Sequence, residues 1–194
     1  MPTVTLEAGS ITAVLDPARS GALLDLTMGD TPLLARGPHA DGADGPLSVA
    51  VAPAVGAMTV IDRSPISCRL AGCSGAAQAL LRYEVSPTSC SAAWTVSAEA
   101  SHGPDAPVPV AVTAIVPRYR AGVDAAVHSG RDGGVRLTWS LSGVEQRGLL
   151  LSAVDGVIGV ETTAEGIVVR VIAERDDAVA LATAGLMIEV TKGV

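Results

Sequence analysis

The fold is decided by residues 11–34, which read ITAVLDPARSGALLDLTMGDTPLL. Two runs rich in apolar and β-branched residues, 10–15 and 22–28, flank a short segment that contains Pro17 and Gly21. Proline presets a negative φ, and glycine supplies the positive φ that many tight turns need. The stretch therefore predicts two antiparallel strands joined by a turn.

The rest of the chain continues this pattern of short strands separated by turn residues. In residues 92–100, Trp94 and Val96 fall on one side of a strand and Thr95 falls on the other, as expected when one face is buried. We predict strands at 3–6, 10–15, 22–28, 47–52, 58–62, 66–71, 78–85, 92–100, 108–116, 135–141, 148–154, 157–162, 167–174 and 186–190. This spacing predicts an all-β fold, an antiparallel β-sandwich that forms a single domain over residues 1–194.

Few segments have a helical pattern, so we expect at most one or two short helices. The candidates are 75–81 and 177–184, the second with Asp176 or Asp177 available as an N-cap and Gly185 as a stop. Either segment also fits a strand. The stretches 35–46, 102–107 and 118–134 are rich in glycine, proline and charge, and they are predicted to be loops long enough to carry a site.

Composition limits the classes of partner. The chain has 194 residues and a formal net charge of −7, which argues against nucleic acid as a partner because phosphate binding needs clustered Lys and Arg. No apolar run approaches the roughly 20 residues of a spanning helix, and the first ten residues show no signal-peptide pattern. We therefore expect a soluble, cytoplasmic protein without a membrane partner. The absence of Phe and Asn and the single lysine, Lys192, indicate a source genome of high G+C content.

The three cysteines, Cys68, Cys73 and Cys90, cannot all pair within one chain. They lack a second cysteine pair or a nearby histidine that would complete a zinc site. Reduced, mostly buried thiols are the first interpretation. A disulfide between Cys68 and Cys73 across a tight turn is the alternative, and it would require an oxidising compartment.

Motifs of catalysis and cofactor binding are missing from the sequence. It has no G-x-S-x-G nucleophile elbow, no phosphate-binding glycine loop, no H-E-x-x-H pair and no calcium loop. We accordingly expect no cofactor and no metal, assign no catalytic residue, and leave open whether the protein is an enzyme.

The best group of candidate ligand-binding residues lies in the predicted loop 118–134. It consists of Arg118, Tyr119, Arg120, His128 and Arg131. Arginine can clamp a carboxylate or phosphate, tyrosine can stack on a sugar ring, and histidine can exchange protons near neutral pH. Solvation of a surface loop explains the same residues without a function.

Other distinctive residues have plainer interpretations. His39, within a Gly- and Asp-rich run, fits a turn better than a cation site because the spacing of a calcium loop is missing. His102 fits the end of a strand. Trp94 and Trp139 lie on the apolar sides of their predicted strands, so both are expected in the core, with a ligand groove as the alternative for either.

Residues 11–34 resemble the opening of galactose-mutarotase-like supersandwich domains, which occur in aldose epimerases, glycoside hydrolases and polysaccharide lyases. The shared features are a D-P-x-x-G turn, a second strand, a glycine turn and a Leu-Leu pair; here they are Asp16, Pro17, Gly21, residues 23–28, Gly29, Leu33 and Leu34. A second partial likeness covers residues 81–117, a Tyr-containing strand followed by a strand that ends V-P-R.

This resemblance implies a β-supersandwich and a carbohydrate ligand. The epimerases of the family rely on paired histidines and a glutamate on interior strands. Here His39, His102 and His128 all fall in predicted loops, and no glutamate stands in a matching motif. The resemblance therefore carries over no catalytic residue.

The sequence supports two functions. The first is a carbohydrate-binding or carbohydrate-active β-sandwich of mutarotase-like type whose reaction is not assigned. The second is a non-catalytic structural or assembly protein, such as an oligomer, phage or virion subunit. A strand-rich chain with one lysine has few charges to protect its sheet edges, so we expect a homo-oligomer under either function.

Overall fold

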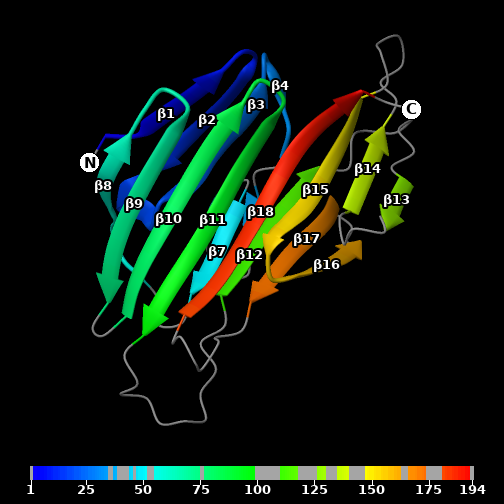
Figure 1. Cartoon of the computed structure of the whole chain (residues 1–194). Helices are drawn as coiled ribbons and strands as arrows, with labels where there is room; N and C mark the ends of the chain where they lie inside the picture. The colour runs from blue at the N-terminus through cyan, green and yellow to red at the C-terminus, as the bar shows by residue number, and fades with distance from the viewer. Residues whose placement is uncertain are drawn as a thin grey trace.

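A computed structural model describes residues 2–34, 37–38, 44–45, 47–51, 55–74, 77–98, 110–117, 126–129, 135–139, 147–162, 166–173 and 181–192 (Figure 1). The side chains of 37–38, 44–45, 47–51, 74, 77, 98, 110–117, 126–129, 135–139, 147–148, 155, 161–162, 166–168, 181 and 192 are not described. Nearly every described element is a β-strand, and all strand pairs are antiparallel.

The strands form two large sheets and one short hairpin. Sheet I has the order β1 (Val4–Ala8), β2 (Ile11–Asp16), β3 (Ala22–Met28), β7 (Leu47–Val51), β12 (Val110–Pro117), β17 (Gly166–Ala173) and β16 (Val157–Thr162), with β4 (Thr31–Pro32) beside β3. Sheet II has the order β13 (Ala126–Ser129), β14 (Val135–Trp139), β15 (Arg147–Asp155), β18 (Leu181–Lys192), β11 (Ser89–Ala98), β10 (Ala77–Ser86), β9 (Ser67–Ser74) and β8 (Thr59–Arg63). The short hairpin pairs β5 (Gly37–Pro38) with β6 (Asp44–Gly45).

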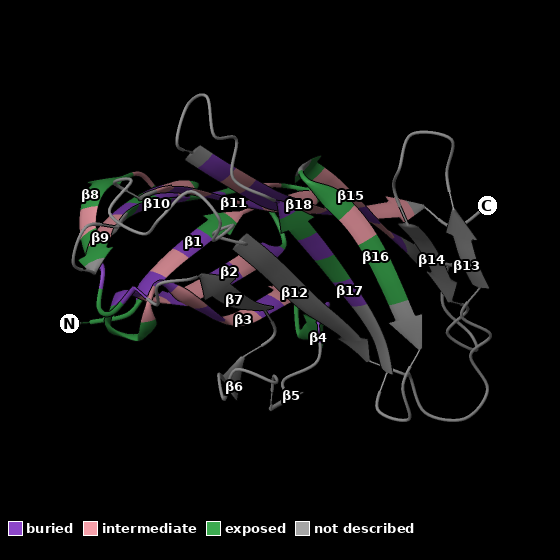
Figure 2. Cartoon of the chain, turned by 90° about the horizontal axis from the view of Figure 1, so that it is seen from below, coloured by how far each residue is buried: buried purple, intermediate pink, exposed green. Residues whose placement is uncertain are grey.

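The two large sheets stack as the layers of a sandwich, with the buried residues between them (Figure 2). Alternation along each strand divides inner from outer positions. On β10, Ala79, Leu81 and Tyr83 are buried while Leu80 is 45% exposed. Because the chain lacks phenylalanine, Val, Leu, Ala and Ile supply most of this core, and Trp94 and Tyr83 are its largest fully buried side chains.

The opening hairpin has the predicted form. Strands β2 and β3 pair, and a 3-10 turn (Pro17–Arg19) joins them, with the Asp16 carboxylate accepting a hydrogen bond from the Ala18 N–H at 2.9 Å. Gly21 adopts φ +71°, the positive angle expected of this glycine. The apolar pair that follows, Leu33 and Leu34, is buried.

One buried hydrogen bond ties this turn to the opposite sheet. The Tyr83 hydroxyl, on β10 of sheet II, donates to the Gly21 carbonyl of sheet I at 3.0 Å. Burial raises the pKa of Tyr83 above its ordinary value, so the hydroxyl stays protonated and keeps its donor. The turn between β2 and β3 is thereby fixed to β10 of sheet II.

The two helix predictions are wrong where the structure describes them. Residues 77–81 belong to β10, and residues 181–184 belong to β18. Each of these strands has a hydrogen-bonded neighbour on both sides, so sheet pairing decides the conformation over a weak local preference.

The predicted loops are only partly loops. β13 lies within 118–134, and the β5–β6 hairpin lies within 35–46. The predicted loop 102–107 lies outside the described residues.

The cysteine disulfide alternative is also wrong. All three thiols are free, with Cys68 and Cys90 buried and Cys73 exposed. Cys68 and Cys73 lie on the same strand, β9, where five residues at about 3.3 Å each separate their Cα atoms by roughly 16 Å. A disulfide requires Cα atoms about 4.4–6.8 Å apart.

Trp94 is 1% exposed and belongs to the core, as predicted, whereas the side chain of Trp139 lies outside the described residues. No described segment forms a helix long and apolar enough to cross a bilayer.

Candidate functional site

Of the five residues predicted to bind a ligand, the structure describes the backbone of His128 alone. It lies on β13, so its prediction as a loop residue is wrong, and its Cα faces that of Arg136 on β14. Arg118, Tyr119, Arg120 and Arg131 lie outside the described residues, as do His39 and His102. Their role in ligand binding stays a prediction.

The register places His128 in a row that crosses sheet II. Arg136 faces Leu150 on β15, and Leu150 faces Glu189 on β18. Three strand spacings of about 4.8 Å separate the backbones of His128 and Glu189 by roughly 14 Å. The sheet thus brings one histidine and one glutamate into the same row without placing their backbones side by side.

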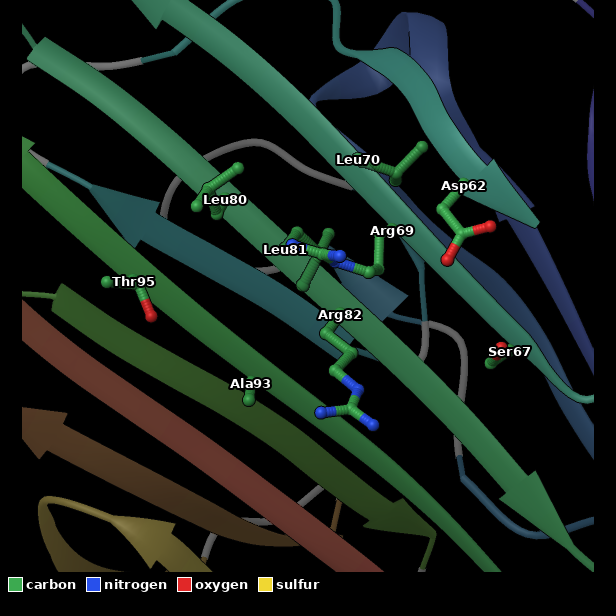
Figure 3. A pocket seen from close by; sticks show the side chains of 9 residues that line it. All are labelled: Asp62, Ser67, Arg69, Leu70, Leu80, Leu81, Arg82, Ala93 and Thr95. Carbon is green, nitrogen blue, oxygen red and sulfur yellow. The ribbon is translucent and has the colours of Figure 1, made fainter.

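The described residues form a different site on the outer face of sheet II, the face turned away from sheet I. A hollow of about 580 Å³ lies across β8 to β11. We call it the central hollow; it is lined by Asp62, Ser67, Arg69, Leu70, Leu80, Leu81, Arg82, Ala93 and Thr95 (Figure 3).

Strand register explains why these side chains meet. Asp62 on β8 faces Arg69 on β9, Arg69 faces Arg82 on β10, and Arg82 faces Ala93 on β11. Directly opposed residues in antiparallel strands have Cβ atoms about 4.5–5.5 Å apart and project from the same face. One row across four strands therefore carries a carboxylate, two guanidinium groups and a small residue.

A second row supplies the less polar side of the hollow. Leu80 faces Thr95, and Thr95 faces Thr183 on β18. The Thr183 hydroxyl donates to the Thr95 hydroxyl at 3.5 Å, and Leu80 is 45% exposed although it is a large apolar side chain. Small and apolar groups thus lie beside the charged row.

The two arginines differ in their partners. Arg82 forms an ion pair with Glu84, two residues along the same strand, and both side chains are well exposed. Such an exposed pair contributes at most about 1 kcal/mol to stability. The Arg69 guanidinium has no hydrogen bond or ion pair within the described part of the chain, and the side chain extends over β10, away from the Asp62 carboxylate (Figure 3).

The chemistry of the central hollow suits binding. Its polar groups are two guanidinium donors, one carboxylate acceptor and the hydroxyls of Ser67 and Thr95. The described side chains whose pKa departs clearly from its ordinary value are Cys68, Tyr83 and Cys90, all buried in the core. Among the described residues no cluster of three or more His, Cys, Asp or Glu side chains is arranged to hold a metal ion.

The sequence contained a signal for this site that the helix prediction hid. Residues 66–71 and 78–85 were predicted as strands, but 75–81 was also predicted as a helix. In the structure β9 and β10 pair as antiparallel neighbours, and Ser74 faces Ala77. Counting back from these two residues pairs Arg69 with Arg82, so reading Gly75 as a hairpin residue would have placed the two arginines together.

A second hollow, of about 520 Å³, lies where the edges of the two sheets meet and is lined by Thr5, Glu7, Arg63, Ser64 and Pro65. Here the Glu7 N–H donates to the Pro65 carbonyl at 2.8 Å, and the Arg63 guanidinium donates to the Thr5 carbonyl at 3.4 Å. These bonds link β1 of sheet I to β8 of sheet II, so we interpret this hollow as structural.

Comparison with known proteins identifies the fold. No protein-family model matches the chain, and no curated protein matches it in sequence. Among solved structures, a candidate aldose 1-epimerase from Escherichia coli K12 matches with a TM-score of 0.69 and 10% identity, over 99% of each chain. A galactose mutarotase-like protein from Lactobacillus casei matches with a TM-score of 0.65 and 11% identity, over 98% of this chain and 100% of its own.

A galactose mutarotase related enzyme from Lactobacillus acidophilus also matches, with a TM-score of 0.58 and 9% identity over 98% of each chain. At these identities the likeness is one of fold. The resemblance found in residues 11–34 is confirmed at that level: the chain has the galactose-mutarotase-like β-sandwich fold.

Proposed function

We propose that this protein binds a carbohydrate in the central hollow of sheet II. The observation that carries the proposal is the fold, shared over nearly the full length of the chain with proteins named as galactose mutarotase-like. Fold alone does not specify a ligand, so the chemistry of the described surface has to support the same ligand class.

The central hollow offers what a sugar ring needs. Arg69 and Arg82 donate hydrogen bonds, the Asp62 carboxylate accepts them, and Leu80 presents an apolar surface to the C–H face of a ring. A hollow of about 580 Å³ lies in the range of about 300–1,000 Å³ that is usual for small ligands. The described residues that line the hollow include no aromatic side chain for stacking, so we expect recognition to rest on hydrogen bonds.

The proposal is tested by saturation-transfer NMR with a panel of neutral and acidic monosaccharides. We expect wild-type protein to show saturation transfer to at least one sugar. Ala93→Tyr should abolish saturation transfer, because it places a large side chain among the residues that line the hollow. Arg170→Ala on β17 is the matched control, since Arg170 is exposed on the outer face of sheet I.

Absence of saturation transfer to any sugar from folded wild-type protein would contradict the proposal. So would an Ala93→Tyr variant that binds as well as the Arg170→Ala control. The same NMR samples report whether the α and β anomers exchange faster with protein than without it, which separates an enzyme from a binding module.

If the protein is instead a non-catalytic structural or assembly protein, we expect a stable symmetric oligomer and no response to sugars. No feature of the described residues favours it over carbohydrate binding. Native mass spectrometry on the same preparation, beside the sugar panel, distinguishes the two.

A further inference from the structure

We infer that the carbohydrate taken by the central hollow carries an oxyanion, a carboxylate or a phosphate, that Arg69 and Arg82 bind together. This inference rests on the proposed function and adds the substrate class. It starts from the position of the two arginines, which face each other directly on neighbouring strands.

Two like charges in this position destabilise a sheet by themselves, because the Cβ atoms of opposed residues lie only about 5 Å apart. The chain has 13 basic residues against 20 acidic ones, so arginines are scarce and acidic neighbours are plentiful. Yet the described neighbours leave Arg69 without an ion-pair partner. An anion bound between the two guanidinium groups would turn this repulsion into attraction.

The existing carboxylates do not fill that role. Asp62 faces Arg69 in the register but forms no ion pair with it, and Figure 3 shows the Arg69 side chain extended toward β10 instead. Glu84 pairs only with Arg82, at an exposed position where water competes. A guanidinium has five N–H donors, so Arg82 can bind a ligand oxyanion while it keeps Glu84.

The surroundings orient the rest of the ligand. In Figure 3 the two arginine side chains point in different directions from adjacent strands, and their long stems allow both to swing onto one anion. Leu80, Ala93 and Thr95 lie beside them on the same face for the neutral ring. The Asp62 carboxylate would repel a second negative charge on the ligand and would accept a hydrogen bond from a sugar hydroxyl. The site should therefore select a sugar that carries a single anionic group.

The experiment compares binding of matched sugars by isothermal titration calorimetry. The ligands are methyl galactoside, methyl galacturonide, methyl glucoside, methyl glucuronide and glucose 6-phosphate, with acetate and inorganic phosphate as free anions. We expect one acidic sugar to bind at least tenfold more tightly than its neutral counterpart, since charge-assisted hydrogen bonds exceed neutral ones. A higher affinity for the uronides than for the sugar phosphate would identify the bound group as a carboxylate. A higher affinity for the sugar phosphate would identify it as a phosphate.

Variants separate the anion contact from sugar binding in general. Arg69→Gln and Arg82→Gln should each reduce the ratio of acidic to neutral affinity to about one, because each loses more affinity for the acidic sugar than for the neutral one. Arg170→Gln, which removes the same charge on the opposite face, should leave the ratio unchanged. Raising the salt concentration from 50 to 500 mM should weaken binding of the acidic sugar and leave binding of the neutral sugar nearly unaffected.

The outcomes for the two proposals are distinct. Equal affinity for neutral and acidic sugars, or an unchanged ratio in both glutamine variants, overturns this inference and leaves carbohydrate binding standing. Inorganic phosphate or acetate that binds as tightly as the acidic sugar also overturns it. No binding of any sugar by folded protein overturns the proposed function itself.

Discussion

Single buried groups connect the two sheets of this protein at the residue scale. The Tyr83 hydroxyl reaches across the core to the Gly21 carbonyl, and a side chain at position 21 would meet Leu81 Cδ2 at 2.6 Å and Leu70 Cδ1 at 2.8 Å. The turn glycine is therefore required for its positive φ and also for the space that it leaves.

Gly21→Ala should destabilise the protein far more than Gly29→Ala. Both glycines have positive φ, but a Cβ at Gly29 would meet nothing within 4 Å. The left-handed conformation costs an alanine about 1–2 kcal/mol at either site, and overpacking of Leu70 and Leu81 adds roughly 1–3 kcal/mol at position 21. Urea unfolding of the two variants checks this; equal losses would show that the core accepts the extra methyl group.

The buried thiols make the free energy of unfolding depend on pH in the alkaline range. Burial raises the pKa of Cys90 from its ordinary value of 9.0 to about 12, so the fold favours the protonated thiol. The contribution is complete below about pH 9 and is lost as pH rises from there toward 12, by at most about 1.4 kcal/mol per pH unit. Cys68 shifts in the same direction, mainly through burial.

We expect the free energy of unfolding to fall between pH 9 and 11 more steeply in wild-type protein than in Cys90→Ala. Urea titrations at several pH values measure both slopes. The difference between them reports the Cys90 thiol together with its electrostatic effect on the Tyr83 hydroxyl, while the contribution of Cys68 is common to both proteins. Identical slopes would mean that Cys90 loses its proton equally readily in both states.

Hydrogen-bonded neighbours on both sides constrain the local geometry of the individual strands. β15 and β18 pair with a register shift between Ala153 and Asp155, which leaves Val154 as an extra residue. Gly185 lies opposite this bulge, where a Cβ would come within 2.9 Å of the Val154 Cβ and 3.1 Å of the Ala92 carbonyl oxygen. The glycine permits three strands, β11, β18 and β15, to stay in close contact.

Gly185→Ala should therefore lower the free energy of unfolding by about 1–3 kcal/mol. The matched variant Gly159→Ala, on β16, should be neutral or slightly stabilising, because the nearest atom to its new Cβ is the Arg170 carbonyl at 3.9 Å. Thermal unfolding compares the two. A Gly185→Ala variant as stable as Gly159→Ala would exclude a role for this glycine in strand packing.

Sequence reasoning succeeded for strands and failed for helices at this scale. It placed 22–28 and 157–162 at their observed bounds because each is a short, largely apolar run with a glycine directly beside it. It predicted helix at 75–81 because alanines there suit either structure. Pairing with strands on both sides fixes this segment as a strand. The positions of those partner strands cannot be read from the residues of the segment itself.

The sandwich as a whole has two different ends. At one end, the bonds from Glu7 to Pro65 and from Arg63 to Thr5 link the edges of the sheets. At the other end, β16 is last in the order of sheet I, where Val157 is 77% exposed and its register partner Ile172 is 42% exposed. Self-association stays a prediction from the sequence, and β16 is the edge at which we expect a second copy to pair.

Val157→Lys should shift wild-type oligomers toward monomer in light scattering coupled to size-exclusion chromatography. A charge on an edge strand blocks pairing with another copy, and an exposed site should tolerate it within about 0.5 kcal/mol. Thr59→Lys, exposed on the β8 edge, is the control. Monomeric wild-type protein at high concentration, or equal masses for both variants, would contradict association through β16.

The sequence by itself determined the all-β sandwich, the opening hairpin, the strand that contains Tyr83 and the core position of Trp94. These features depend on residues close in the chain, whose alternation and turn chemistry act locally. Only the tertiary structure decided that the Tyr83 hydroxyl meets the Gly21 carbonyl and that Thr95 on β11 faces Thr183 on β18. Such contacts depend on strand order and register, which the packing of the complete core selects.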